Sequence, residues 1–353
     1  MAPTLMELPG SLLTEILLRL PEPEDLARAS AACPAFRRLA TDASFLRRFR
    51  RLHAPRFLAF IDLDGFQPAL PPHPAAPAAR ALASAADFSF SFLPSHCRWI
   101  PMDIRDGRVL LGRDHGKDAR PPICRELAVC DPLHRRYVLL PPVPDALVAS
   151  AERPPPVLRR PSDEPLLLPL GENGEGTATA FTVISMVHCE TKLAPFVFSS
   201  STGQWRAAAP MLWSAMPVSP MDPAYLRRHH AYGCFYWDST NIKRKELLVL
   251  NIQRMEHNKG KNSGQWQMVK TFSLGPEGLH YLKAATERCV LLICSEAPRL
   301  VGLSMVMPDL LEYISVDVKK LQLERVCVKP FGKSLSRTRI YAHFPPSLSS
   351  PTI

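Results

Sequence analysis

Prolines recur through this chain so often that they limit how long any helix can be. The sequence holds 37 prolines in 353 residues, about twice the usual share of roughly 5%. Because proline lacks a backbone donor and clashes with the preceding helical turn, long helices are hard to place beyond the first fifty residues. The remainder of the chain is expected to consist of turns and short strands.

Length and composition indicate a folded protein with two units. A chain of 353 residues exceeds the usual size of a single core, about 100–200 residues. Hydrophobic residues make up 46% and charged residues 22%, which argues against global disorder. The net charge of +10 would favour acidic partners, but the basic residues are dispersed and the densest run, at 47–51, has helical spacing. We expect a solvated helix face there and no nucleic-acid contact.

The cysteines and the N-terminal residues indicate in which cellular compartment the chain is expected. Nine cysteines form no C-x-x-C pair and leave an odd thiol, so we expect reduced thiols and no disulfide framework. The first ten residues lack the order of a secretory signal, and no uncharged apolar run is long enough to span a membrane. The chain is therefore expected in the cytosol, the nucleus or both, with no membrane partner.

The first fifty residues predict four short helices. The expected elements are a helix over 8–20 that Pro21 ends, a helix from Pro23 to Cys33, a third carrying Phe36 and Leu39, and a fourth that begins at the N-cap Asp42. The result is a compact helical module of about fifty residues, which is near the lower size limit for independent folding.

The first helix carries more apolar surface than one small core needs. At about 100° per residue, its apolar side chains cover an arc of roughly 140°, and Leu18 points elsewhere. The side chains within the arc are Leu12, Leu13, Ile16, Leu17 and Leu20. We expect a partner or the following domain to cover the excess. For each leucine the alternative is burial in the module's own core, and periodicity alone does not separate the two.

These residues carry a specific resemblance. The order consists of Leu8-Pro9, Leu12, Glu15-Ile16-Leu17, Leu20-Pro21, Asp25-Leu26, Ala29-Ser30, Cys33 and Phe36-Arg37. Over residues 5 to about 52 this order resembles the F-box motif, particularly as found in plant F-box proteins, although the family often has Trp-Arg where this chain has Phe36-Arg37. The resemblance implies binding to a Skp-type adaptor, which links the protein to a cullin. By that analogy the adaptor-binding residues are Leu8, Pro9, Leu12, Ile16, Leu20 and Pro21.

Two stretches are rich in proline. Residues 66–87 are a Pro/Ala-rich segment with little to bury and are interpreted as a linker or a solvent loop. Residues 141–176 are rich in Pro, Glu and Gly, and the leucines at 166–168 are consistent with a short strand inside them. The second stretch is therefore expected to be an insertion within a domain rather than a boundary.

A loose repeat of short apolar runs follows the helical module. The order of two strands, a turn and another strand recurs three times, with second strands beginning at 127, 196 and 247, and a weaker fourth unit is expected around 289–306. Repeats of about 40–50 residues with several strands are typical of propeller blades, in which each sheet is buried by its neighbours. A β-propeller is therefore expected ahead of a β-sandwich. Trp205, Trp237 and Trp266 recur near strand ends and are expected to pack between blades.

This half of the chain also resembles the C-terminal domain of F-box proteins from grasses. The resemblance lies in D-x-x-D-G-R-V-L-L at 103–111, V-C-D-P at 129–132, F-S-S-S-T-G-Q-W at 198–205 and G-C-F-Y-W at 233–237. We therefore expect an α+β multidomain protein with a small N-terminal helical F-box module and a following all-β domain. The expected divisions are the F-box module at 1–54, a linker and first strands at 55–95, a β-propeller-like recognition domain at 96–346 with a Pro-rich insertion at about 141–176, and a tail at 347–353.

No motif in the sequence predicts catalysis or a metal site. Gly332-Lys333-Ser334 has the ending of a phosphate-binding loop, but Cys327 stands where the loop needs glycine. No G-x-S-x-G elbow occurs, and His96-Cys97 and His188-Cys189 lie in strand-like contexts. The cysteines and histidines supply no set of four zinc ligands. We expect no catalytic residue, no metal and no cofactor.

The resemblance implies a substrate-recognition subunit of an SCF-type cullin-RING ubiquitin ligase. The F-box would dock on a Skp-type adaptor, and through it on a cullin, while the β domain binds a protein target that the sequence does not identify. An alternative is a propeller-type binding protein or enzyme in which the helical N-terminus is only a structural cap. A further alternative keeps adaptor binding but uses it for scaffolding without degradation.

Overall fold

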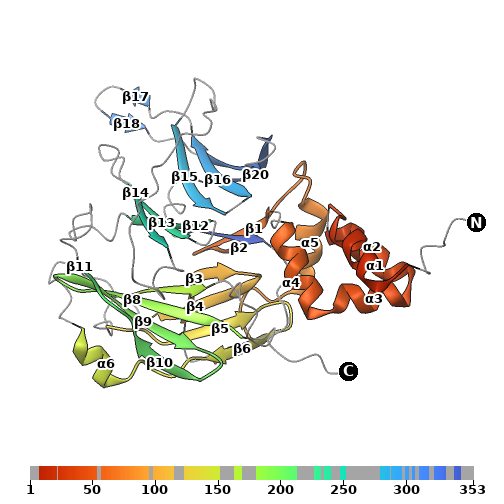
Figure 1. Ribbon diagram of the computed structural model, residues 1–353. Coiled ribbons are helices and arrows are strands. Elements are labelled where there is room, and N and C mark those ends of the chain that lie inside the picture. The colour runs from red at the N-terminus through yellow and green to blue at the C-terminus, as the bar shows by residue number, and fades with distance from the viewer. Residues whose placement is uncertain are drawn as a thin grey trace, which may run out of the picture. The chain divides into compact units, whose positions relative to one another are not determined.

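The structure is a computed structural model, and its helices and strands are labelled in Figure 1. The described residues are 8–21, 23–53, 57–94, 98–114, 123–151, 163–168, 180–212, 226–231, 234–239, 247–251, 279–286, 288–295, 299–301, 304–306, 310–317, 322–330 and 338–342. The chain divides into two compact units, Met1–Pro55 (unit 1) and Arg56–Ile353 (unit 2). Helices make up the first unit, and antiparallel sheets dominate the second.

Unit 1 contains the four helices that the sequence predicts. They are α1 (Gly10–Leu18), α2 (Pro23–Ala32), α3 (Pro34–Thr41) and α4 (Ala43–Leu52). Their ends follow local chemistry: Pro34 occupies the first turn of α3, and the Asp42 carboxylate accepts a hydrogen bond of 2.9 Å from the Phe45 backbone N–H. The predicted N-cap at Asp42 is therefore confirmed.

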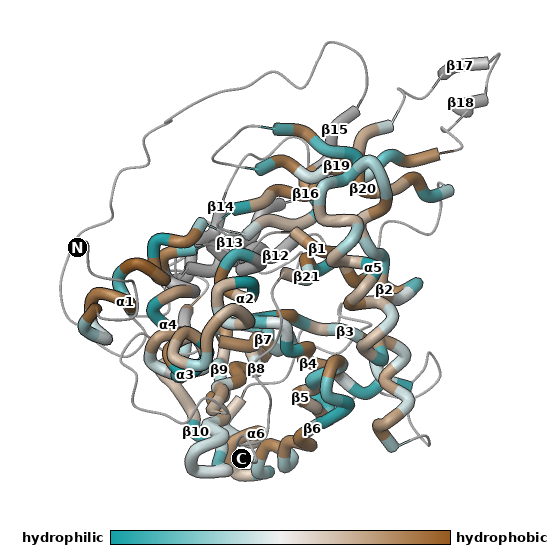
Figure 2. The backbone as a smooth tube through the Cα atoms, turned by 90° about the vertical axis from the view of Figure 1, so that its right-hand side faces the viewer, coloured by the Kyte–Doolittle hydropathy of each residue, from teal (hydrophilic) through white to brown (hydrophobic). Residues whose placement is uncertain are grey.

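The core of unit 1 corrects one detail of the expected helix face. Leu18 was expected to point away from the apolar arc, yet it is only 2% exposed. Leu13 and Leu17 are buried with it, whereas Leu12 and Ile16 are exposed. Helix α1 contacts both α3 and α4, so its buried face is rotated toward Leu18. Figure 2 shows the hydrophobic colouring that runs along α1.

Three antiparallel meanders form the middle of unit 2. The first contains β3 (Arg98–Arg105), β4 (Arg108–Asp114), β5 (Leu127–Asp131) and β6 (Arg136–Leu139); the second contains β7 (Asp163–Leu168), β8 (Thr182–His188), β9 (Lys192–Ser199), β10 (Gln204–Ala207) and the short β11 (Met211–Leu212); the third contains β12 (Leu226–Ala231), β13 (Cys234–Ser239) and β14 (Leu247–Asn251). Most strands of the sequence repeat are therefore found where they were predicted. The run at 266–272 and Trp266 lie outside the described residues.

The fourth meander and a hairpin follow toward the C-terminus. The meander runs β15 (Leu279–Ala285), β16 (Cys289–Ser295), β19 (Leu310–Asp317) and β20 (Gln322–Pro330), and the hairpin consists of β17 (Arg299–Val301) and β18 (Ser304–Val306). The weaker fourth unit expected around 289–306 therefore includes strand β16 of the meander and both strands of the hairpin.

A separate sheet joins the two ends of unit 2. In it β1 (Phe57–Asp62) lies between β2 (Gly65–Pro68) and β21 (Arg339–Ala342). Phe60 pairs with Ile340 in this register, across nearly the whole length of the unit. This sheet therefore pairs the first described strand of unit 2 with the last one.

Three pairs of sheets in unit 2 share cores: the β15–β16–β19–β20 sheet with the β1 sheet, the β1 sheet with the β3–β6 sheet, and the β3–β6 sheet with the β7–β10 sheet. A sheet can share a core on each side because alternate residues of a strand point to opposite faces. In β4, Val109 and Leu111 join a core with the β1 sheet, while Leu110 joins a core with Val183 and Phe198 of the β7–β10 sheet. In β21, Ile340 packs in a core with β16, β19 and β20, while Tyr341 joins the core shared with β4. These sheets are therefore buried on both faces by different neighbours.

Edge strands of these sheets also contact one another. Contacts join β21 with β3, β3 with β7, β12 with β15 and β15 with β21. Each of these strands lies at an edge of its own sheet. Strands β3, β7, β12 and β15 are also the first strands of their sheets in chain order, whereas β21 is the last of its sheet.

The Pro/Ala-rich stretch expected to be a linker is partly helical, which corrects the expectation for residues 66–87. Helix α5 (Ala76–Ala85) has a proline in its first turn and buries Ala76, Ala79 and Leu82. It contacts β1 and β2. Alanine has the highest helix propensity and proline is tolerated at a helix start, so a composition typical of a linker folds as a helix against a sheet.

The short strand expected inside the second Pro-rich stretch is present. The leucines at 166–168 belong to strand β7, and Leu166 and Leu167 are buried. A short helix, α6 (Asp145–Ser150), precedes that strand. Residues 152–162 and 169–179 lie outside the described part. None of the described helices is long and apolar enough to cross a membrane.

Candidate functional site

The six residues predicted to bind an adaptor surround helix α1. Leu12 is 50% exposed and Ile16 is 41% exposed. Pro9 and Pro21, at the two ends of the helix region, are exposed, while Leu8 and Leu20 are half-buried. Leu20 packs partly against the core of unit 1. Four residues of the set are therefore exposed, Leu8 is half-buried, and Leu20 is half-buried with part of its side chain against the core.

Leu12 and Ile16 form what we name the exposed row of α1. Residues four apart on a helix lie one above the other on the same face, so the two side chains are neighbours. Neither takes part in the core, which uses Leu13, Leu17 and Leu18 on the opposite side of the helix. Apolar side chains of this size gain about 1.5–3 kcal/mol each when fully buried, so the row is suited to an apolar partner surface.

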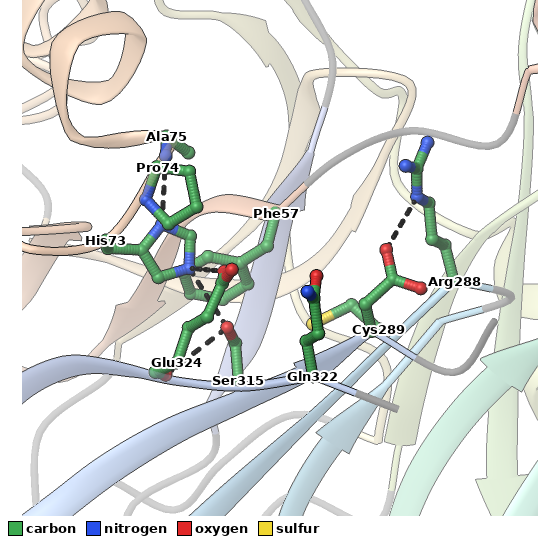
Figure 3. Close-up of a pocket in the computed structure, with 10 residues that line it drawn as sticks. Phe57, His73, Pro74, Ala75, Arg288, Cys289, Ser315, Gln322 and Glu324 are labelled. Atoms are coloured by element: carbon green, nitrogen blue, oxygen red, sulfur yellow. Dashed lines mark hydrogen bonds and ion pairs between the residues drawn. The ribbon is translucent and has the colours of Figure 1, made fainter. Parts of the chain in front are cut away.

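A pocket of about 140 Å³ lies in unit 2 and is drawn in Figure 3. Its apolar walls are Phe57, Pro74, Ala75 and Cys289. Its polar lining consists of His73, Arg288, Ser315, Asp317, Gln322 and Glu324. These residues come from the first residue of β1, the turn before α5, and the adjoining ends of β16, β19 and β20.

His73 is a buried polar side chain of this pocket, and its hydrogen bonds fix its tautomer. The backbone N–H of Ala75 donates to His73 Nδ1 at 3.1 Å, so Nδ1 is an acceptor and the ring proton of the neutral imidazole is on Nε2. Nε2 lies 3.0 Å from Ser315 Oγ and 3.4 Å from a Glu324 carboxylate oxygen. Burial lowers the pKa of His73, which favours this neutral form.

The grouping of Ser315, His73 and Glu324 does not have the geometry of a hydrolase triad. In a triad the serine hydroxyl gives its proton to the unprotonated ring nitrogen, and a carboxylate holds the N–H on the other side of the ring. Here the nitrogen beside Ser315 carries the proton, and Glu324 lies on that same side. His73 therefore acts as a donor toward Ser315 and is not placed to act as its base.

Cys289 is also unsuited to nucleophilic attack. Burial raises the pKa of its thiol to about 12, whereas the reactive form of cysteine is the thiolate. The pocket therefore offers a set of binding groups rather than an activated nucleophile.

A second polar contact lies across the pocket from His73. Arg288 Nε donates to Asp317 Oδ2 at 3.1 Å, and Figure 3 shows Cys289 and Gln322 between this pair and the His73 end. The charged residues of the lining are thus two carboxylates, Asp317 and Glu324, and one guanidinium, Arg288.

Other side chains that the sequence analysis names are packed in or against the cores of unit 2. Trp205 donates its indole N–H to the Pro141 carbonyl at 2.7 Å and packs against the core between the β3–β6 and β7–β10 sheets. Cys189 is buried and carries a thiol rather than a disulfide, as do Cys33, Cys124, Cys130, Cys289, Cys294 and Cys327. Within the described part of the chain, no three His, Cys, Asp or Glu side chains come together as a metal site would require.

The pocket contains residues that the sequence motifs did not indicate. His73 and Ser315 are separated by 242 positions, and no short spacing connects them. The only local signal is the proline-rich turn before α5, which holds His73, and that signal was interpreted as a loop.

Three comparisons with known proteins bear on these sites. A sequence profile of the family described as F-box-like matches residues 5–52. A comparison with curated proteins finds no match. A solved structure from a study of two prolyl endopeptidases matches at 9% identity with a TM-score of 0.26, covering 77% of this chain and 45% of that one. This chain therefore spans less than half of that structure, and a likeness so weak carries no argument about fold or activity. The segment 5–52, which includes helices α1 to α4 and the exposed row, is similar to the F-box-like family.

Proposed function

We propose that this protein is a substrate-recognition subunit of an SCF-type cullin-RING ubiquitin ligase. The observation that carries the proposal is the coincidence of the F-box-like match at 5–52 with a helical unit that leaves two large apolar side chains of α1 exposed. Unit 1 docks on a Skp-type adaptor, the adaptor connects it to a cullin, and unit 2 binds the protein target.

The adaptor-docking surface in this proposal is centred on the exposed row of α1. Leu12 and Ile16 supply the central apolar contact, since buried apolar anchors dominate interface energies. Leu8, Pro9, Leu20 and Pro21 lie around both ends of the helix and complete the surface. Leu13 and Leu17 are excluded from it, because they are 6% and 3% exposed and already packed in the core.

We further propose that unit 2 is a β-propeller, as in the grass-type F-box proteins that its motifs resemble. The support is the cores shared by three pairs of neighbouring sheets, the contacts among the edge strands β21, β3 and β7 and among β12, β15 and β21, and the sheet that joins β1 to β21. Such an order of sheets, with the last strand returning to the first, is what a closed ring of blades requires.

In this function the chain performs no bond-making chemistry of its own. It holds the target close to a ubiquitin-loaded enzyme, and holding two reactants together raises their effective concentration. The reaction takes place in the cytosol, the nucleus or both. The pocket in unit 2 is consistent with a binding role, because its histidine donates toward Ser315 and its cysteine is a buried thiol.

Co-purification with a Skp-type adaptor tests the proposal. The full chain is compared with a variant carrying Leu12→Ala and Ile16→Ala, and circular dichroism checks that both are folded. We expect the adaptor to be captured by the original chain and lost by the folded variant. If the folded original chain captures no adaptor, the helical unit is a structural cap and the ligase function is wrong.

A further inference from the structure

Strand β6 leaves one edge of the β3–β6 sheet open. It stands at the end of the sheet order β3-β4-β5-β6, and Figure 1 shows it as the outermost strand of that sheet. In the part of the chain that the structure describes, no strand pairs with its other side. All of its residues, Arg136–Leu139, are exposed. An edge strand presents a row of unpaired backbone N–H and C=O groups, so β6 can accept a further strand.

The register of β6 shows which of its backbone groups point to the open side. In antiparallel pairing, opposite residues alternate between pairs that exchange hydrogen bonds and pairs that do not. The Leu140 N–H donates to the Leu127 carbonyl at 2.9 Å, and the register continues from there into β6. Leu139 and Tyr137 precede Leu140 by odd steps, so they belong to the pairs that exchange none. Their N–H and C=O groups therefore point away from β5.

The side chains of Tyr137 and Leu139 form an apolar surface beside this edge. Residues two apart in a strand share a face. Tyr137 is 39% exposed and Leu139 is 47% exposed, and the ring of Tyr137 lies 6.2 Å from that of Phe92 between centroids. Phe92 is partly buried against the core shared by the β1 and β3–β6 sheets. A strand added here therefore covers apolar side chains as well as backbone groups.

Two arginines place positive charge at the start of this edge. Arg135, in the turn before β6, and Arg136 are exposed, and in the described part of the chain neither guanidinium is held in an ion pair. Asp131 is opposite Arg136 in the ladder. Its buried carboxylate accepts hydrogen bonds from the backbone of the same turn and from His134 Nδ1 at 2.7 Å. The charge that complements the two arginines is an acidic group on the incoming strand.

The neighbouring sheet lacks this combination at its own edge. Strand β10 also stands at the end of its sheet, and Arg206 is exposed on it. The large apolar side chain of β10 is Trp205, which is half-buried and donates its indole N–H to the Pro141 carbonyl. Strand β10 therefore has a charge at an edge but no exposed apolar row, and it provides a control for β6.

We propose that an extended segment of a protein partner adds to β6 as an antiparallel strand. The residues of the segment opposite Tyr137 and Leu139 exchange hydrogen bonds with them and carry apolar side chains. Because the added strand runs against β6, its acidic residue follows toward its C-terminal end, opposite Arg136. That the partner is the target of the ligase rests on the proposed function, whereas the binding of the segment does not.

Fluorescence anisotropy of hexapeptides labelled at the N-terminus and titrated with the full chain tests the proposal. The main probe is Thr-Val-Thr-Val-Glu-Glu amide. A second probe has both valines N-methylated, which removes the N–H groups that the β6 carbonyls accept from, and a third has lysine in place of both glutamates. We expect a Kd on the order of 100 μM for the main probe. Binding of the second should be at least about tenfold weaker, and of the third at least about fivefold weaker.

Variants of β6 locate the binding. Leu139→Pro removes an outward N–H but no hydrogen bond to β5, which is a position where strands tolerate proline, and it should weaken the main probe about tenfold. Arg135→Gln/Arg136→Gln removes both charges at exposed positions and should weaken it about fivefold, as for two exposed ion pairs. Arg206→Gln on β10 is the matched control and should leave the affinity unchanged. If Leu139→Pro does not fold, the double glutamine variant decides.

Several results would overturn the proposal. Equal binding of the N-methylated probe would exclude strand addition, equal binding of the lysine probe would exclude selection by charge, and equal weakening by Arg206→Gln would place the binding elsewhere. No binding of any probe would mean that the edge is closed to peptides. Self-association of the chain that Leu139→Pro abolishes would mean that a second copy occupies the edge.

Adaptor capture is measured on the same preparations. Loss of peptide binding with adaptor capture retained refutes this inference alone, whereas peptide binding without adaptor capture refutes the ligase function alone.

Discussion

The exposed row of α1 and the pocket of unit 2 are opposite kinds of surface. Leu12 and Ile16 are large apolar side chains with no polar group to satisfy, and burial by a partner is the way in which they gain free energy. In the pocket, His73, Ser315, Arg288 and Asp317 already hold hydrogen bonds within the chain. The row is therefore suited to a stable subunit contact, whereas several polar groups of the pocket are already satisfied by the chain itself.

The largest expected effect is a loss of unfolding free energy on the buried side of α1, which the exposed side should not show. Leu17 is 3% exposed and its neighbour Ile16 is 41% exposed. Leu17→Ala is expected to lower the free energy of unfolding of unit 1 by about 2–5 kcal/mol, because it leaves a cavity in the core. Chemical denaturation followed by helical circular dichroism measures the change.

Ile16→Ala is the matched control for that measurement and is expected to change stability by within about 0.5 kcal/mol, as at most surface positions. Equal losses for the two variants would mean that Ile16 is part of the core and that α1 has no free apolar face.

The next largest effect concerns the buried hydrogen bonds of unit 2. The Tyr341 hydroxyl donates to the Gly107 carbonyl at 2.9 Å, linking β21 to the β3–β4 turn. Tyr341→Phe is expected to cost about 1–3 kcal/mol, because the carbonyl loses its partner in a buried site. Thermal unfolding with Tyr137→Phe as control, at a 39% exposed tyrosine, measures it. No difference between the two would show that this hydrogen bond adds little to the stability of unit 2.

A smaller effect is expected at the start of α4. Asp42 accepts from the Phe45 backbone N–H at 2.9 Å, and loss of such a cap costs about 1 kcal/mol. Asp42→Ala should therefore lower the stability of unit 1 by that amount, and Asp42→Ser, which keeps a capping oxygen, should restore most of it. Denaturation of both variants tests whether local capping contributes to unit 1 as core packing does.

The smallest effect is a pH dependence in unit 2. Burial lowers the pKa of His73 below its ordinary value of 6.5, so the unfolded chain binds this proton more readily than the folded one. Stability is therefore lost as the pH falls below the unfolded-state pKa of about 6.5.

His73→Asn keeps an acceptor for the Ala75 N–H but cannot titrate, and it should show a shallower loss of unfolding temperature between neutral and acidic pH. Glu324 faces His73 at 3.4 Å and is present in both proteins, so the difference between them reports His73. An unchanged pH slope would contradict the buried, neutral histidine.

Local chemistry explains which parts could be predicted from the sequence. Asp42 acts within a few residues of its own position, and the helix start that it caps was predicted correctly. The orientation of Leu18 was wrong because an arc of apolar residues does not reveal which neighbours pack on a helix, and α1 contacts both α3 and α4. Helix α5 was missed because its alanines look like a linker until β1 and β2 cover Ala79 and Leu82.

The pocket could not have been predicted in the same way. Its two ends depend on His73 meeting Ser315 and on Arg288 meeting Asp317, and both depend on how distant strands pair. By contrast, the strands that carry the repeat were predictable because each one is a short apolar run between turns.

The affinity of the purified chain for a Skp-type adaptor tests the central claim most directly. Calorimetric titration would compare the original chain with Leu12→Ala/Ile16→Ala and with Leu323→Ala, a control leucine of unit 2 that is 47% exposed. We expect at least about a tenfold loss of affinity for the double variant, since each tenfold is about 1.4 kcal/mol and central apolar anchors cost more than that on truncation. We expect no loss for Leu323→Ala. Adaptor binding that is equally tight in all three proteins would contradict the central claim.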